Sequence, residues 1–156
     1  MRKAAHTKGI FCVEGLWDPD LKVRSSVRPL LELLQQVAGI NYIHRNCATG
    51  QELEFYLGKW VQKKYKAYPI LYVASHGVEY AITLGAESYS LDDLAGVLEG
   101  QCANRLIMMS SCSTLGIDKR YLKRFLERTE ALAVCGYRTD VDWLRSAAFE
   151  LLLLSE

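Results

Sequence analysis

The sequence has almost no net charge and no long hydrophobic run. Lys and Arg number 19 and Asp and Glu number 18, which gives a formal charge of +1. Nucleic acids and anionic membranes favour proteins with a basic excess, so neither is an expected partner. No apolar run approaches the length of about 18 residues that a transmembrane helix needs. The apolar segment after the basic N-terminus stops at Glu14, too early for a signal peptide. These absences predict a cytoplasmic protein.

The sequence also lacks the spacings typical of disulfide frameworks, metal sites and nucleotide loops. Its five cysteines are an odd number without a CxxC pair, and neither GxGxxG nor GxxxxGK[ST] occurs. We therefore expect reduced thiols, no metal and no cofactor. Cys12 and Cys135 lie inside apolar runs and are predicted to be small core residues. Cys112 differs because serines flank it.

Short apolar runs alternate with amphipathic stretches along the chain. Strands are expected at residues 9–13, 41–45, 69–74, 105–109 and 131–135. Helices are expected at residues 26–38, 49–61, 90–98, 118–128 and from 142 onwards. Residues 78–84 alternate weakly, as in a short hairpin or edge strand. This order predicts an α/β fold with a mainly parallel sheet covered by helices on both faces.

No linker, repeat or low-complexity segment interrupts the pattern, so residues 1–156 are expected to form a single domain. The last helix is still apolar at Leu154. That pattern leaves open whether a C-terminal segment is missing. Trp60 and Trp143 lie on apolar helix faces and are predicted to be core residues.

Two successive strands of the expected sheet end in residues capable of covalent chemistry. His76 and Gly77 follow the third strand, and Cys112 follows the fourth. Sites in parallel sheets lie at the carboxyl ends of the strands, so we expect the imidazole and the thiol at one rim. A thiolate beside a histidine is a nucleophile with its base. The N–H groups of Gly77 and Cys112 are expected to form an oxyanion hole.

Each of these residues taken singly has a simpler interpretation. A histidine after a strand is usually structural or exposed, and a lone cysteine usually packs as a small hydrophobe. The occurrence of both on successive strands, each followed by a small residue, favours catalysis.

Together the two motifs resemble those of the clan CD peptidases, which include caspases, metacaspases, separase and the CHAT peptidases. A strand ending in His-Gly precedes one ending in Ser-Ser-Cys-Ser-Thr, and residues 110–116 are most similar to the CHAT nucleophile motif, with Ser113 in place of its usual Glu. The likeness spans about residues 66–154 and includes the strand and helix after Cys112. It implies a caspase-like three-layer α/β/α sandwich and a cysteine endopeptidase with His76 and Cys112 as its dyad. It also implies a protein or peptide substrate and a role in stress or antiphage defence, gated by a protein or nucleotide activator.

The sequence leaves the preference for the substrate residue before the scissile bond (P1) open. Asp140 and Asp142 follow the fifth strand and would suit a basic side chain. One of them can instead cap the last helix, and Arg138 would favour an acidic substrate residue.

Two residues at the ends of the first strands also have two interpretations each. Glu14 either orients a catalytic group or is solvated, and His44 either joins the rim or is a hydrogen-bonded structural histidine. Two other functions remain as alternatives to the peptidase. One is a non-catalytic caspase-fold module that senses a nucleotide or a protein partner, and the other is a flavodoxin-like signalling domain in which Cys112 only packs.

Overall fold

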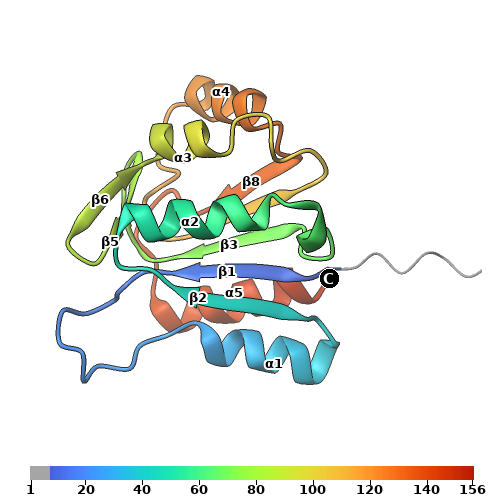
Figure 1. Ribbon diagram of the computed structural model, residues 1–156. Coiled ribbons are helices and arrows are strands. Elements are labelled where there is room, and N and C mark those ends of the chain that lie inside the picture. The colour runs from blue at the N-terminus through green and yellow to red at the C-terminus, as the bar shows by residue number, and fades with distance from the viewer. Residues whose placement is uncertain (1–7) are drawn as a thin grey trace, which may run out of the picture.

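Five parallel strands in the order β2-β1-β3-β7-β8 form the central sheet of the computed structural model, which describes residues 8–156 (Figure 1). They are β1 Ile10–Glu14, β2 Tyr42–Asn46, β3 Ile70–Ala74, β7 Leu106–Ser110 and β8 Ala133–Gly136. The helices are α1 Arg28–Ala38, α2 Gly50–Trp60, α3 Leu91–Val97, α4 Lys119–Thr129 and α5 Trp143–Ser155, with a 3₁₀ turn at Lys63–Tyr65. The predicted α/β fold with a mainly parallel sheet is confirmed, and each predicted strand and helix lies within two residues of its expected bounds.

Local signals in the sequence set the helix ends. The Thr49 hydroxyl accepts a hydrogen bond from the Glu52 N–H at 3.2 Å and begins α2. Ser90 and Asp118 cap α3 and α4 in the same way. Gly39 ends α1 with a φ of 68°, a left-handed conformation that glycine adopts without strain.

Each face of the sheet packs against its own layer of helices. On one face, Phe11, Leu71 and Ile107 belong to a core with α2, α3 and α4. On the other, Ile10 and Tyr72 belong to a second core with α1 and α5. Figure 1 shows this arrangement, with α1 and α5 on the side of the sheet opposite α2. Successive side chains along each strand therefore pack into two separate cores, one on each face of the sheet, as a three-layer sandwich requires.

The segment after β3 forms a second sheet of three antiparallel strands, β4 His76–Val78, β5 Ala81–Leu84 and β6 Glu87–Ser90. The weak alternation of residues 78–84 indicated a hairpin, but the sheet also includes His76. This histidine therefore begins a new strand, separated from β3 by Ser75, instead of forming the tip of β3.

Two predicted core residues are exposed. Cys135 lies on β8, which is an edge strand, and α5 leaves Trp143 45% exposed. Cys135 is exposed because β8 has no further neighbour on its outer side within residues 8–156. Trp143 is exposed because it begins α5 at the mouth of a pocket, where its ring meets that of Trp17. Trp60, by contrast, is fully buried as predicted.

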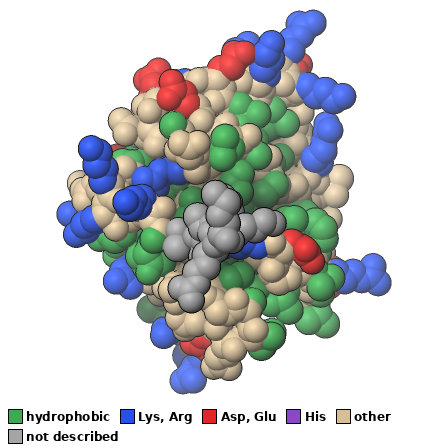
Figure 2. Space-filling model, turned by 90° about the vertical axis from the view of Figure 1, so that its right-hand side faces the viewer, with side chains coloured by type: hydrophobic (Ala, Val, Ile, Leu, Met, Phe, Trp, Pro, Cys, Tyr) green, Lys and Arg blue, Asp and Glu red, His purple; other side chains and the backbone are tan. Residues whose placement is uncertain are grey.

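Figure 2 views the molecule from the end at which the strands begin. Hydrophobic side chains gather there around the grey residues, Lys and Arg project from the periphery, and no histidine side chain is visible. Within residues 8–156, every helix is too short or too polar to cross a bilayer. The predicted site residues His76 and Cys112 lie at the opposite end, where the strands finish.

Candidate active site

β3 and β7 are neighbours in register, and this pairing brings the two predicted site residues to one rim. Ala74 is opposite Ser110, and the next N–H, of Ser75, donates to the Ser110 carbonyl at 3.3 Å. His76 and Cys112 follow these pairs and line the same pocket, of about 390 Å³. The predicted juxtaposition of imidazole and thiol at one pocket therefore has a direct structural basis.

Cys112 lies in a tight turn directly after β7. The Ser111 and Thr114 hydroxyls are 2.7 Å apart within this turn, and Ser113 adopts a φ of 57°. The Val141 N–H points at the sulfur, 3.5 Å from Sγ. The Val141 carbonyl oxygen also lies near the sulfur, 3.9 Å from Sγ, so the backbone at Val141 packs directly against Cys112.

The other four thiols differ from Cys112 in their surroundings. Burial raises the pKa of Cys12 well above its ordinary value, that of Cys47 to about 12 and that of Cys102 to about 11. The pKa of Cys135 is also raised, mainly by desolvation of the thiol and to a smaller extent by the Glu150 carboxylate. None of these four lines the pocket. Cys112 is the cysteine to which a ligand in the pocket has access.

His76 is held by the backbone of Trp17. Its Nε2 lies 2.6 Å from the Trp17 carbonyl oxygen, and the two rings meet edge to face with centroids 5.1 Å apart. A carbonyl oxygen only accepts hydrogen bonds, so this contact places a proton on Nε2 and leaves the lone pair of neutral imidazole on Nδ1. Among residues 8–156, no hydrogen bond joins the His76 ring to Cys112. The Trp17 carbonyl, and not the thiol, therefore orients the histidine.

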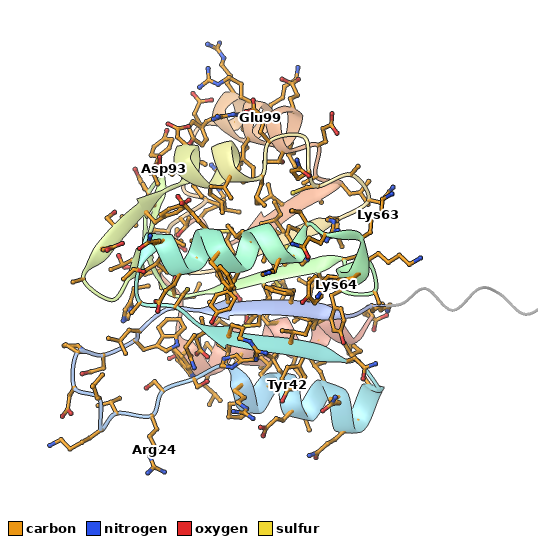
Figure 3. All side chains as sticks on the ribbon, viewed as in Figure 1. Arg24, Tyr42, Lys63, Lys64, Asp93 and Glu99 are labelled. Atoms are coloured by element: carbon orange, nitrogen blue, oxygen red, sulfur yellow. The ribbon has the colours of Figure 1, made fainter. Side chains whose placement is uncertain are left out.

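The buried Glu14 anchors the segment that carries Trp17. Its carboxylate accepts hydrogen bonds from four donors: Trp17 Nε1 at 2.6 Å, Ser26 Oγ at 2.8 Å, the Val27 N–H at 2.8 Å and His44 Nε2 at 2.5 Å. These bonds tie both ends of the 15–27 loop to the end of β1. Figure 3 shows the loop extending from the sheet, with the Arg24 side chain projecting outwards.

The four bonds also set the protonation of Glu14. Burial raises the pKa of this carboxyl, but the hydrogen bonds, led by that from His44, outweigh burial and bring it below 4.5. Of the two interpretations of Glu14, the orienting one fits its 1% exposure and the solvated one does not. His44 is the hydrogen-bonded structural histidine of the second interpretation.

Gly77 allows β4 to pack against the turn that contains Cys112. A Cβ built on it would lie 2.1 Å from Thr114 Oγ1 and 2.6 Å from the Cys112 carbonyl oxygen, so no larger residue fits without movement. Within the described residues, the Cys112 N–H donates to no other group. The oxyanion hole formed by the Gly77 and Cys112 N–H groups stays a prediction.

The two aspartates predicted as substrate contacts lie on the segment beside Cys112. The Asp142 carboxylate accepts from the Arg145 N–H at 2.9 Å and caps α5. Asp140 accepts from Ser113 Oγ at 2.8 Å. Both are exposed and neither lines the pocket, whereas Val141 between them does.

Sequence reasoning missed Glu150, which lies in the wall of the pocket on α5 and is 2% exposed. Its carboxylate accepts hydrogen bonds from the hydroxyls of Tyr72, Ser110 and Tyr137. The available signal was a single acidic residue inside an apolar helical run, residues 147–154. An isolated carboxylate on a buried helix face needs polar partners, and such partners often belong to a site.

The arrangement of sheet, helices and pocket defines a caspase-like α/β fold, and one solved structure illustrates the likeness. The chain is similar to the crystal structure of caspase-1 from Spodoptera frugiperda, with a TM-score of 0.50 and 14% sequence identity. The match covers 69% of this chain and 48% of the caspase chain, so the chain spans about half the length of that caspase.

Residues 7–155 match the family of unknown function DUF6642, and the chain belongs to this family. No curated protein matches the sequence at a significant level.

Proposed function

We propose that the chain is a cysteine endopeptidase in which Cys112 is the nucleophile and His76 the general base. The observation that carries the proposal is the shared pocket. The Cys112 thiol and an imidazole oriented by Trp17 line the same space, at the rim where sites of parallel sheets lie. The caspase-like fold agrees with this assignment but does not by itself imply activity.

In the proposed reaction, His76 Nδ1 takes the proton of the Cys112 thiol, and the resulting thiolate attacks the scissile carbonyl carbon and forms a C–S bond. The carbonyl oxygen becomes an oxyanion facing the N–H groups of Gly77 and Cys112. The tetrahedral intermediate then collapses, the C–N bond breaks, and the amine leaves with a proton supplied by His76. Water, activated by the same histidine, hydrolyses the thioester and restores the free thiol. Asp140 and Asp142 stay in the proposal as substrate contacts at the rim.

The contact between Val141 and Cys112 supports a regulated enzyme. The Val141 N–H and carbonyl both face Sγ, at 3.5 and 3.9 Å, so the 137–142 segment covers part of the nucleophile. A substrate carbonyl has to reach this sulfur, so movement of the segment would raise activity. The likeness of residues 110–116 to the CHAT motif supports a protease of stress or antiphage defence, switched on by a protein or a nucleotide signal.

One observation favours a second candidate, a non-catalytic caspase-fold module that senses a nucleotide or protein partner. His76 Nε2 and Cys112 Sγ are each bonded to backbone and not to one another. In a sensing module the pocket would hold a signal molecule, and the thiol would stay chemically silent.

Labelling of the cysteines by a peptidyl electrophile separates the two candidates. Peptidyl acyloxymethyl ketones lose a carboxylate when a bound thiolate attacks them, so intact-mass spectrometry counts modified cysteines. We expect single labelling of the wild type, none of Cys112→Ala, and slow labelling of His76→Ala. Cys135→Ala is the matched control, because Cys135 is an exposed cysteine that lies outside the pocket.

Two results would count against the peptidase. Equal labelling of wild type and Cys112→Ala would refute Cys112 as the nucleophile. Absence of labelling across a set with Arg, Leu and Asp at P1, together with nucleotide binding by calorimetry, would favour the sensing module.

A further inference from the structure

The pocket beside Cys112 contains a buried carboxylate without a cationic partner. Glu150 is 2% exposed, and within residues 8–156 no Lys, Arg or His lies within salt-bridge distance of it. Buried carboxylates are normally paired with a cation or a metal, because an isolated charge is costly to remove from water. A carboxylate that lines a cavity can take that cation from a ligand.

Three neutral hydroxyls hold this carboxylate in place. Ser110 Oγ and the Tyr137 hydroxyl donate to Oε1 at 2.7 and 2.8 Å, and the Tyr72 hydroxyl donates to Oε2. A carboxylate has about four acceptor positions, so one remains for a ligand. The pKa of Tyr72 is raised, mainly by burial and to a smaller extent by the charge of Glu150 and the hydrogen bond to it. The Tyr72 hydroxyl therefore stays protonated and can donate. Burial is also the main cause of the raised pKa of Tyr137.

The walls of the pocket suit a long side chain that ends in a planar cation. Trp17 and Trp143 line it with their rings edge to face, 4.6 Å between centroids, and Val27, Leu30 and Ala147 add apolar surface. Aliphatic stems pack on such surface, and a guanidinium stacks favourably on indole.

We propose that this pocket binds the P1 side chain of the substrate and that Glu150 selects a guanidinium, so that the peptidase cleaves after arginine. This inference rests on the proposed function, because Cys112 and Glu150 line one pocket. Ser110 links the two, since it bonds to Glu150 and lies two residues before Cys112. A side chain that reaches Glu150 would therefore bring the adjoining carbonyl towards the nucleophile. Arginine is favoured over lysine because a guanidinium can stack and donate two parallel hydrogen bonds to a carboxylate.

Glu150 is a better candidate for this role than the two aspartates on the 137–142 segment. Asp142 caps α5 through the Arg145 N–H, and Asp140 accepts a hydrogen bond from the Ser113 hydroxyl. Both are in contact with water, where a charge contributes little to affinity. Glu150 lies in a largely apolar cavity, where a charge-assisted hydrogen bond is stronger.

Binding of small ligands tests the charge preference independently of proteolysis. Butylguanidinium and butylurea have the same shape and differ in charge. In NMR titrations of the wild type we expect butylguanidinium to bind at least about tenfold more tightly and to shift the indole N–H signals of Trp17 and Trp143. In Glu150→Gln the amide oxygen can still accept from Ser110 and Tyr137, while the amide nitrogen faces the Tyr72 hydroxyl, which can turn to accept from it. The preference for the cation should disappear in this variant.

Glu127→Gln on α4 is the matched control, since its side chain is 64% exposed and remote from the pocket; it should leave both affinities unchanged. Equal affinity of the wild type for the two ligands would overturn the inference. So would a preference that survives in Glu150→Gln or is lost only in Asp140→Asn. Should Glu150→Gln fail to fold, the wild-type comparison decides.

Cleavage completes the test with two fluorogenic peptides that differ only at P1, arginine or citrulline. The expected preference in kcat/KM for arginine over citrulline is about tenfold or more, and a preference for citrulline would refute the inference. Failure of this inference and of the peptidase are distinguishable. If the wild type does not prefer butylguanidinium but Cys112 is still labelled, only the arginine preference is refuted. If butylguanidinium binds selectively but Cys112 is not labelled, the peptidase activity is refuted.

Discussion

The His76 ring is bonded to the backbone of Trp17, 59 residues earlier in the chain, with 2.6 Å between Nε2 and the carbonyl oxygen. Trp17 in turn donates through its indole N–H to the buried Glu14 at 2.6 Å. A strand end, a loop residue and the proposed base therefore form one connected unit. The loop residue serves twice, because its backbone orients the imidazole while its ring forms a wall of the pocket.

Replacement of Trp17 should slow catalysis without abolishing the nucleophile. Trp17→Ala removes the bond to Glu14 and the ring contact, so the carbonyl that orients His76 becomes mobile. We expect kcat/KM, or the rate of Cys112 labelling, to fall by about 10- to 100-fold. Trp17→Phe keeps an aromatic ring and should lose less. Unchanged rates in Trp17→Ala would show that His76 needs no such support.

Glu14 should make folding stability sensitive to acid. Its pKa is lowered in the folded state, so its contribution is fully present above about pH 4.5 and is lost as the pH falls through the lowered pKa. Glu14→Gln does not titrate, and its amide nitrogen cannot accept from the donors that face it. We expect it to lose about 2 kcal/mol at neutral pH and to show a flatter dependence of unfolding free energy on pH between about 5 and 2. Urea unfolding across this pH range measures the unfolding free energy of wild type and variant. If the two free energies change with pH in the same way, Glu14 is not the group responsible for the acid sensitivity.

Two glycines should respond to alanine in opposite directions. In Gly77→Ala the new Cβ would overlap Thr114 Oγ1, at 2.1 Å, and push β4 away from the Cys112 turn. We expect a loss of about 1–3 kcal/mol and of Cys112 labelling. Gly58 lies on the exposed side of α2 with nothing within 4 Å, and Gly58→Ala should stabilise by about 0.5–1 kcal/mol. Thermal melts compare the pair, and a tolerated Gly77→Ala would exclude the close packing described here.

Asp142 should act on stability through the α5 cap. Asp142→Ala removes the acceptor of the Arg145 N–H and should lower the unfolding free energy by about 1 kcal/mol. Asp142→Asn and Asp142→Ser are conservative caps and should recover most of it. If Asp142→Ala melts like the wild type but cleaves arginine peptides poorly, the substrate-contact role is favoured over the cap.

The order of strands and helices could be predicted because the signals are local. An apolar run of five residues, a capping hydroxyl at Thr49 or a glycine at position 39 is read within one turn or one strand. The same patterns indicated that His76 and Cys112 follow successive strands, and β3 and β7 are neighbours. These local patterns do not distinguish a central strand from an edge strand, so the prediction that Cys135 is a core residue is wrong.

The surroundings of the proposed dyad could not be read in this way. Glu14 joins His44 across 30 positions, and Glu150 joins Tyr72 across 78. Such contacts depend on where a loop and a terminal helix pack against the sheet. The spacing of residues along the chain does not indicate these packing positions. The sequence by itself determined the layered fold and the two residues proposed for chemistry. Only the tertiary structure decided which carboxylates support them, because burial and hydrogen bonding at these sites arise from the packing of distant segments.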